Sequence, residues 1–211
     1  MSRVFITGSS DGLGLLAGKL LVEQGHQVTL HARNEARAAA ARQALPRAET
    51  VVVGDVSTIA TMRDVAEQVN ARDHYDAVIH NVAVGSREPR RDTADCRSLC
   101  VAVNVLAPYL LTALIARPNR LVYLSSGMHS SGNPSLDDPH WKARRWNGSQ
   151  AYSDSKLLDL LLACAVARRW PDVLSNAVTP GWVPTRMGGA GAPDDLRLGA
   201  VTQAWLAVSN E

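Results

Sequence analysis

The stretch VFITGSSDGLG, residues 4–14, runs from four apolar or β-branched residues into a turn with three glycines. VFIT predicts a strand, and the apolar residues at 13, 16, 17, 20 and 21 have helical spacing. Gly8 can turn the chain sharply, Gly12 lets the backbone approach a pyrophosphate, and Gly14 lets the helix lie tight on the strand. The turn therefore predicts a phosphate site at a helix N-terminus, although an ordinary strand–helix turn also uses glycine for its positive φ.

The alternation of short apolar runs and helical patterns continues outward from this turn. Further strands are expected at 27–31, 50–54, 75–80, 120–124 and 174–178, with helices between them. This order predicts an α/β fold: a doubly wound, mostly parallel sheet with helices on both faces and a crevice at the carboxyl ends of its strands. We expect one domain over 1–211, with no seventh strand, because the chain stops at AWLAVSNE just after the last expected helix.

Composition excludes several classes of protein. The formal net charge of +2 is far from the dense basic stripe that nucleic-acid binding requires. The longest apolar runs, around 105–116 and 157–167, are broken by Pro108 and Asp159, and both fall short of the ~18 residues that span a membrane. The cysteines suggest neither a metal site nor a disulfide, so a reducing, cytoplasmic location fits best: Cys96, Cys100 and Cys164.

The end of the second expected strand indicates which nucleotide is bound. An NAD site places Asp or Glu about 20 residues beyond the glycines, where it holds the ribose 2′-hydroxyl. LHARNE (30–35) instead has Arg33 and no acid before Glu35, and an arginine suits the 2′-phosphate of NADP. We therefore predict NADP, with NAD as the alternative. Asp55, after the third strand, is placed either to meet the adenine amino group or to cap the next helix.

AYSDSK (151–156) sets Tyr152 and Lys156 four residues apart, just before an almost wholly apolar helix. On a helix their Cβ atoms lie about 5–6 Å apart on one face. A nearby ammonium lowers the pKa of a tyrosine hydroxyl, as a general acid–base group requires. A surface tyrosine beside a surface lysine is the alternative when this spacing is considered alone.

The combination of TGxxxGxG with YxxxK resembles the short-chain dehydrogenase/reductase family, nearest to its retinol-dehydrogenase-like branch. This resemblance covers essentially the whole chain. It implies a Rossmann-type NAD(P)-dependent oxidoreductase. By position it implies catalytic roles for Ser126 in LVYLSS, Asn104 in VAVNVLAPY, Tyr152 and Lys156.

The resemblance also implies which residues contact the coenzyme. They lie in the glycine turn, at the ends of the next three strands, on the YxxxK helix and in PGWVPT (180–185), the segment expected to meet the nicotinamide amide. They are Thr7, Gly8, Ser10, Asp11, Gly12, Leu13, Gly14, Arg33, Asp55, Val56, Asn81, Ala83, Lys156, Pro180, Gly181, Val183 and Thr185.

The sequence departs from the family pattern in two internal segments. In HNVAVG (80–85), Val82 and Val84 stand where members usually carry an asparagine and a glycine, which puts this loop's approach to the coenzyme in doubt. Segment 127–149 is longer than in most members, and we predict a substrate-side insertion that forms a lid or pocket wall, with loop packing as the alternative. The candidate substrate residues are Ser126, His129, Trp141, Trp146 and Trp182.

Together these features predict NADP-dependent hydride transfer between the nicotinamide and a small-molecule carbonyl or alcohol, with Tyr152 as general acid–base and no metal. Asn104 is expected to hold a water that relays protons. The alternative is a non-catalytic NADP-binding sensor or scaffold of the same fold, and a sugar-nucleotide epimerase ranks third. The apolar run LLDLLLACAVA (157–167) makes a homo-oligomer plausible, with burial against the sheet as the alternative.

Overall fold

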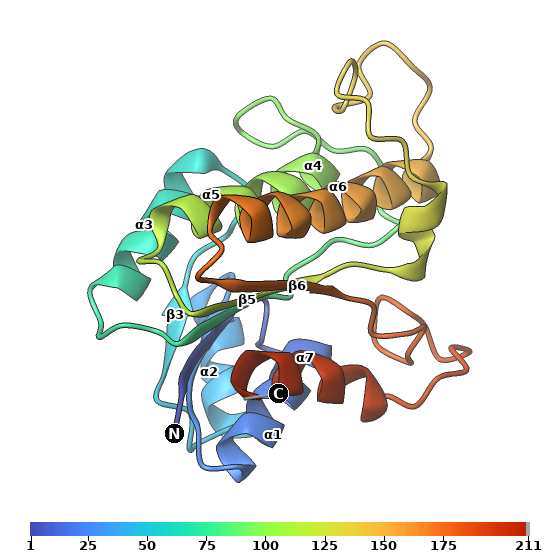
Figure 1. Ribbon diagram of the computed structural model, residues 1–211. Helices are drawn as coiled ribbons and strands as arrows, with labels where there is room; N and C mark the ends of the chain where they lie inside the picture. The colour runs from blue at the N-terminus through green and yellow to red at the C-terminus, as the bar shows by residue number, and fades with distance from the viewer. Residues whose placement is uncertain (210–211) are drawn as a thin grey trace.

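A computed structural model describes residues 1–209, which form one parallel sheet with helices on both faces (Figure 1). Among these residues the sheet has six strands in the order β3-β2-β1-β4-β5-β6. The bounds are β1 Arg3–Ile6, β2 Gln27–Ala32, β3 Thr50–Val53, β4 Ala77–His80, β5 Arg120–Leu124 and β6 Leu174–Val178. The chain order reverses between β1 and β4, so the predicted doubly wound fold is confirmed.

The helices form two layers (Figure 1). One layer holds α1 (Gly12–Glu23), α2 (Glu35–Ala44) and α7 (Leu198–Val208). The other holds α3 (Ile59–Asn70), α4 (Leu99–Val101), the π-helix η1 (Ala102–Leu106), α5 (Ala107–Leu114) and α6 (Gly148–Arg169). A short 3₁₀ helix, η2 (Gly127–Ser131), follows β5 and packs against α6.

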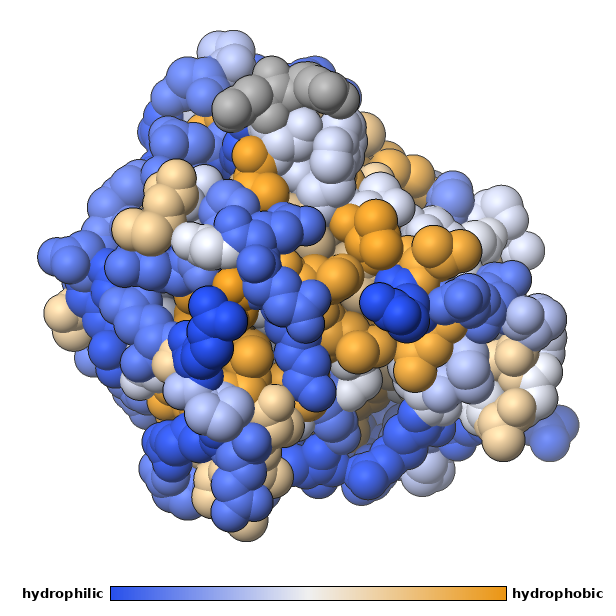
Figure 2. Space-filling model, turned by 90° about the horizontal axis from the view of Figure 1, so that it is seen from below, coloured by the Kyte–Doolittle hydropathy of each residue, from blue (hydrophilic) through white to orange (hydrophobic). Residues whose placement is uncertain are grey.

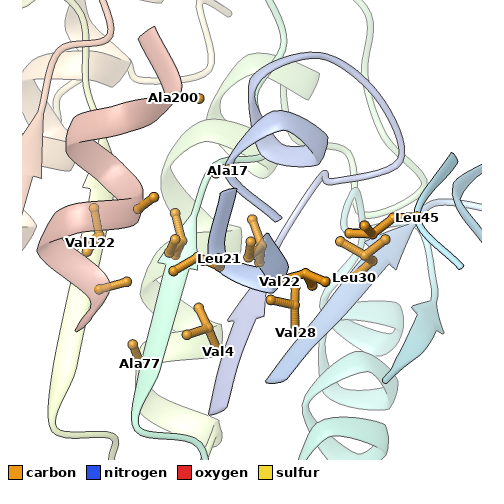
Figure 3. Close-up of a cluster of buried hydrophobic side chains, with 14 of the residues drawn as sticks. Val4, Ala17, Leu21, Val22, Val28, Leu30, Leu45, Ala77, Val122 and Ala200 are labelled. Atoms are coloured by element: carbon orange, nitrogen blue, oxygen red, sulfur yellow. The ribbon is translucent and has the colours of Figure 1, made fainter. Parts of the chain in front are cut away.

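The sheet is buried on both faces, which explains why its strands read as apolar runs rather than as alternating ones. On one face, Val4, Leu30 and Val122 meet Leu21 of α1 and Ala200 of α7 (Figure 3). A second cluster lies on the other face, between the sheet and α3, α5 and α6. Packing on both faces of the sheet fixes the positions of the strands, and therefore of their carboxyl ends, relative to one another.

The outer face of the first layer is mixed, with apolar residues interspersed among hydrophilic ones (Figure 2). Leu198, Val201 and Trp205 of α7 are all exposed there. No helix within residues 1–209 is both long and apolar enough to cross a membrane. Assembly through α6 stays a prediction.

Candidate functional site

A cleft of about 720 Å³ opens at the carboxyl ends of the strands, beside the point where the chain order reverses. The glycine turn, the ends of β2 and β3, the loop after β4 and the N-terminal part of α6 line it. Residues 180–187, after β6, contribute Pro180, Thr185, Arg186 and Met187. This is the place where open α/β sheets bind ligands.

The glycines of the turn are required by its geometry. Gly8 has φ +61° and Gly12 has φ +55°, a region that residues with a Cβ rarely adopt. A Cβ on Gly14 would lie 2.5 Å from Nδ2 of Asn81 and 2.9 Å from the carbonyl oxygen of Gly8. Gly14 is therefore required for close packing, whereas Gly8 and Gly12 are required for the shape of the turn.

The N-terminus of α1 differs from those of α2, α3 and α6. Side chains of Asn34, Thr58 and Asn147 accept hydrogen bonds from first-turn N–H groups of those three helices. Asp11 makes no such bond to α1, whose first turn also has no acidic residue. Gly12 and Leu13 of this turn line the cleft, so its N–H groups and helix dipole fit an anion such as a dinucleotide pyrophosphate.

His31 fastens the turn to the sheet, a role that sequence reasoning missed. The backbone N–H of Gly8 donates to its Nδ1 at 2.9 Å, and its Nε2 donates to the carbonyl oxygen of Gly54 at 2.9 Å. Burial lowers the pKa of His31 to about 4, so the ring is neutral and can accept at Nδ1. The signal in the sequence was one histidine inside a strand that is buried along most of its length.

Two arginines stand at the β2 side of the cleft, where the sequence analysis expected one. Arg33 and Arg37 both line it, together with Asp11 and Asp55. The Nη1 atom of Arg37 lies 2.5 Å from Oδ2 of Asp11, and both side chains are partly exposed. Arg37 lies in the first turn of α2, just after the loop that carries Arg33, so its place soon after the end of β2 was the signal that could have found it.

The loop after β4 does not need the glycine that the family usually carries. Within residues 1–209 the non-glycine residues with positive φ are Cys96 and Trp141, so Val82 and Val84 are unstrained. Thr7 Oγ1 accepts from the N–H groups of Asn81 and Val82. Both valines line the cleft without a left-handed backbone, so this loop reaches the site with no glycine at either position, and its contact with the coenzyme stays a prediction.

Asn104 ties this loop to the helices above it. Its Oδ1 accepts from Val84 N–H at 2.8 Å, while its Nδ2 lies 3.0 Å from both the Val84 carbonyl oxygen and Ser155 Oγ. The residue is fully buried in η1, a π-helical segment that joins α4 to α5. The amide is thus engaged by protein groups. π-helical segments of this kind often occur at functional sites.

Tyr152 and Lys156 both line the cleft from α6. The ammonium nitrogen of Lys156 lies 5.8 Å from the centroid of the Tyr152 ring. The same nitrogen donates to the carbonyl oxygen of Leu124, at the end of β5, at 2.7 Å. The helix therefore brings the phenol and the ammonium to one side of the cleft, next to the carboxyl end of the sheet.

The two serines after β5 are placed differently. Ser125 is buried, lines the cleft, and donates its hydroxyl hydrogen to the carbonyl oxygen of Lys156 at 2.8 Å. Ser126 lies beside the cleft rather than in its lining, and its Oγ accepts from Met128 N–H at 3.3 Å. A hydroxyl has only one hydrogen, so Ser126 keeps its own for another acceptor, whereas Ser125 has already used its own.

Most residues expected to contact the coenzyme line the cleft. These are Gly8, Ser10, Asp11, Gly12, Leu13, Arg33, Asp55, Val56, Asn81, Ala83, Lys156, Pro180 and Thr185. The others are Thr7, Gly14, Gly181 and Val183, which support the lining: Thr7 through its hydrogen bonds to the β4 loop, Gly14 through packing. Gly181 takes φ +81°, and Val183 is buried.

The residues lining the cleft that the sequence analysis missed come largely from loops. They are His31, Arg37, Ser57, Val82, Val84, Glu88, Arg91, Asp92, Thr93, Leu99, Val103, Leu124, Ser125, Arg186 and Met187. Several belong to the connection between β4 and α4, which has no regular motif to reveal it.

The structure does not bring the candidate substrate residues His129, Trp141, Trp146 and Trp182 to the cleft. Trp141 is only 6% exposed and packs against Cys100 and Ala151, with Trp146 at 5.5 Å between ring centroids. Loop packing, the alternative to a pocket wall, therefore describes this pair, because burying a large ring anchors a long polar loop. His129 donates to Ser126 O in η2, and Trp182 is exposed.

Comparisons with known proteins agree with this geometry. The family model described as short chain dehydrogenase matches residues 2–128. An uncharacterised oxidoreductase of Emericella nidulans is 48% identical over 200 residues, covering 93% of this chain and 76% of that protein. A short-chain dehydrogenase of Gibberella zeae is 39% identical, covering 98% and 81%. Retinol dehydrogenase 13 of Homo sapiens is 30% identical, covering 88% and 60%.

Solved structures show the same fold. An uncharacterised protein from Mycobacterium paratuberculosis aligns with a TM-score of 0.85 at 27% identity, over 100% of this chain and 78% of that one. A blue fluorescent protein from a metagenomic library, solved in complex with NADPH, aligns with a TM-score of 0.78 at 20% identity, over 99% and 91%. The predicted resemblance is confirmed: this chain belongs to the short-chain dehydrogenase/reductase family and is an oxidoreductase with a site for a nicotinamide cofactor.

Proposed function

We propose that the protein transfers hydride between NADP(H) and a carbonyl or alcohol group of a small molecule. The observation that carries the proposal is the shared cleft: Tyr152 and Lys156 line it together with the glycine turn. A nicotinamide, when bound, supplies or accepts the hydride. The chain itself must bind the dinucleotide, orient the substrate oxygen and move one proton.

Tyr152 is proposed as the proton donor for carbonyl reduction and as the acceptor in the reverse direction. Lys156 stands on the same side of the cleft and carries a positive charge that favours the phenolate left after proton donation. Ser126, which retains its hydroxyl hydrogen, is proposed to donate it to the substrate oxygen. Asn104 is assigned the role of holding the β4 loop, because its amide already bonds Val84 and Ser155.

NADP is proposed over NAD because two arginines, Arg33 and Arg37, reach the β2 side of the cleft. A guanidinium can bind phosphate oxygens in bidentate fashion, so a pair suits a 2′-phosphate. The helix N-terminus of α1 is proposed for the pyrophosphate, and Thr185 with Pro180 for the nicotinamide end. Segment 127–149 is proposed to border the substrate entrance without forming the wall of the cleft.

The test is Tyr152→Phe, assayed by NADPH consumption over a panel of aldehydes and ketones. Removing the hydroxyl should lower the rate of reduction by about 100-fold or more, since general acid–base catalysis contributes that much. NADPH binding, followed by fluorescence, should stay nearly unchanged because the ring remains. Tyr109→Phe is the matched control, since Tyr109 is exposed on α5 away from the cleft. Equal activity in Tyr152→Phe would refute the assignment.

A further inference from the structure

The active-site lysine has a buried partner on its own helix. Nζ of Lys156 lies 2.8 Å from Oδ2 of Asp159, three residues further along α6. The two side chains are only 3% and 5% exposed, so the ion pair is withdrawn from water. In the sequence Asp159 is merely a break in a run of leucines, and nothing in the proposed proton transfer requires it.

Burying a charged carboxylate at this position costs desolvation free energy. Burial raises the pKa of Asp159 to about 6, against the opposing pull of the Lys156 ammonium. Burial pulls down the pKa of Lys156, but the charge and hydrogen bond of Asp159, with smaller contributions from Tyr152 and Cys100, together raise it above its ordinary value. Leucines at 157, 158, 160, 161 and 162 surround Asp159 in the sequence, and an apolar residue there would avoid the cost of desolvation. The geometry gives the carboxylate one evident use, which is its contact with Lys156.

The other titratable groups near the pair lie on three elements. On α6, the Tyr152 ring faces the ammonium, while Tyr123 of β5 and Cys100 of α4 interact electrostatically with Asp159. Burial raises the pKa of Cys100 to about 11 and also raises that of Tyr123, so both are neutral at ordinary pH. Neither can replace Asp159 as the counter-charge of the ammonium.

The ammonium has three N–H donors. One donates to the Leu124 carbonyl oxygen at 2.7 Å and one to Asp159 at 2.8 Å. We propose that Asp159 is a positioning residue for Lys156: its carboxylate and the Leu124 carbonyl hold the ammonium in place, so that its remaining N–H serves the cleft and its charge is kept before any coenzyme arrives. The part that concerns the coenzyme depends on the proposed function, whereas the ion pair does not.

The test titrates the protein without coenzyme, using NMR of lysine labelled at Cε and Nζ. The chain has only three lysines, so Lys19 and Lys142 serve as internal references. In Asp159→Asn the titration midpoint of Lys156 should fall by about one pH unit or more, because an opposite charge at this distance raises an amine pKa by that amount. Asp159→Glu, which keeps the charge, should restore most of the shift.

Asp154→Asn is the matched control. Asp154 is also buried on α6, but it bonds Arg144, Gln150 and the backbone of Asn133 instead of Lys156. This variant should leave the Lys156 midpoint where it is. In parallel, Asp159→Asn should weaken NADPH binding several-fold while Asp154→Asn does not. An unchanged Lys156 midpoint in Asp159→Asn overturns the proposal, whatever happens to coenzyme binding.

A measurement on the wild-type protein covers the case in which Asp159→Asn does not fold. The Lys156 signals should shift with the same midpoint as the Asp159 carboxyl carbon, because protonating the carboxyl removes the partner charge. Independent titration of the two groups would contradict the proposal. If NADPH binds no form of the protein, the proposed function fails while the lysine titration still decides the role of Asp159.

Discussion

One ion pair lies on the β2 side of the cleft and another on the β5 side, and the two pairs differ mainly in how exposed their side chains are. On the β2 side, Arg37 and Asp11 pair at 2.5 Å with side chains 26% and 55% exposed. On the β5 side, Lys156 and Asp159 pair at 2.8 Å with side chains 3% and 5% exposed. The contacts look alike by distance, but water can replace either partner only in the first.

This difference suggests different uses. An exposed pair contributes about 0–1 kcal/mol and is screened by salt, so Arg37 can exchange Asp11 for a phosphate at little cost. Breaking a buried pair by removing one partner costs about 3–5 kcal/mol, so Lys156 is held in one arrangement. We infer that the first pair suits selection of a ligand and the second suits fixed chemistry.

The largest effect is expected from Lys156→Met, which leaves Asp159 buried without its partner. The variant should lose about 3–5 kcal/mol of unfolding free energy near neutral pH. Without the ammonium the raised pKa of Asp159 rises further, so the folded state binds a proton more tightly than the unfolded one. Its stability is therefore greatest in acid and falls as pH rises through the folded-state pKa.

Urea unfolding at about pH 5 and about pH 8 measures this loss. The double variant Lys156→Met with Asp159→Leu removes both charges and should regain the stability at the higher pH while remaining inactive. If Lys156→Met had the same unfolding free energy at both pH values, then breaking the buried pair would affect stability no more than breaking the exposed pair.

An intermediate effect is expected on coenzyme choice. Arg33→Ala and Arg37→Ala should each weaken NADPH binding by about tenfold, near 1.4 kcal/mol, with a much smaller change for NADH, which lacks the 2′-phosphate. Fluorescence titration with both coenzymes measures this. Arg42→Ala is the control, because Arg42 lies on α2 outside the lining of the cleft. A parallel loss for both coenzymes would remove the basis for NADP.

The smallest effect is expected from Asp11→Ala. Asp11 does not cap α1 and its ion pair is exposed, so the unfolding free energy should change by no more than about 0.5 kcal/mol. NADPH should bind slightly tighter, because Arg37 loses a competing anion and the cleft loses a negative charge. Thermal unfolding and titration at two salt concentrations check both statements. A large loss of stability would mean that the two pairs are energetically alike.

Much of the fold could be predicted from the sequence because it rests on local patterns. The strand–glycine–helix unit at 4–14 and the apolar runs of the sheet act through neighbours in the chain. The same holds for Tyr152 and Lys156, whose spacing on one helix puts them side by side. Family resemblance then pointed to PGWVPT, of which Pro180 and Thr185 line the cleft, and to Ser126, which does not and whose role stays a prediction.

Other features of the site depend on contacts between segments far apart in sequence. A tryptophan such as Trp141 is a reasonable candidate for a pocket wall. Its side chain is instead buried against Cys100 and Ala151, outside the lining of the cleft. In the sequence, Val84 only departs from the family pattern in the loop after β4. The structure shows that Asn104, twenty residues later, hydrogen-bonds both the N–H and the carbonyl oxygen of Val84. Sequence patterns cannot show such pairings, because any polar residue in range could have been the partner.

The sequence by itself determined the doubly wound sheet, the glycine turn and the phenol–ammonium pair, because strand and helix periodicity and φ preferences are properties of short segments. Only the tertiary structure decided that the neutral ring of His31 hydrogen-bonds the backbone of both Gly8 and Gly54, and that Asp159 forms an ion pair with Lys156. The physical reason is burial: the cost of charging a histidine or a carboxylate depends on how much water surrounds it.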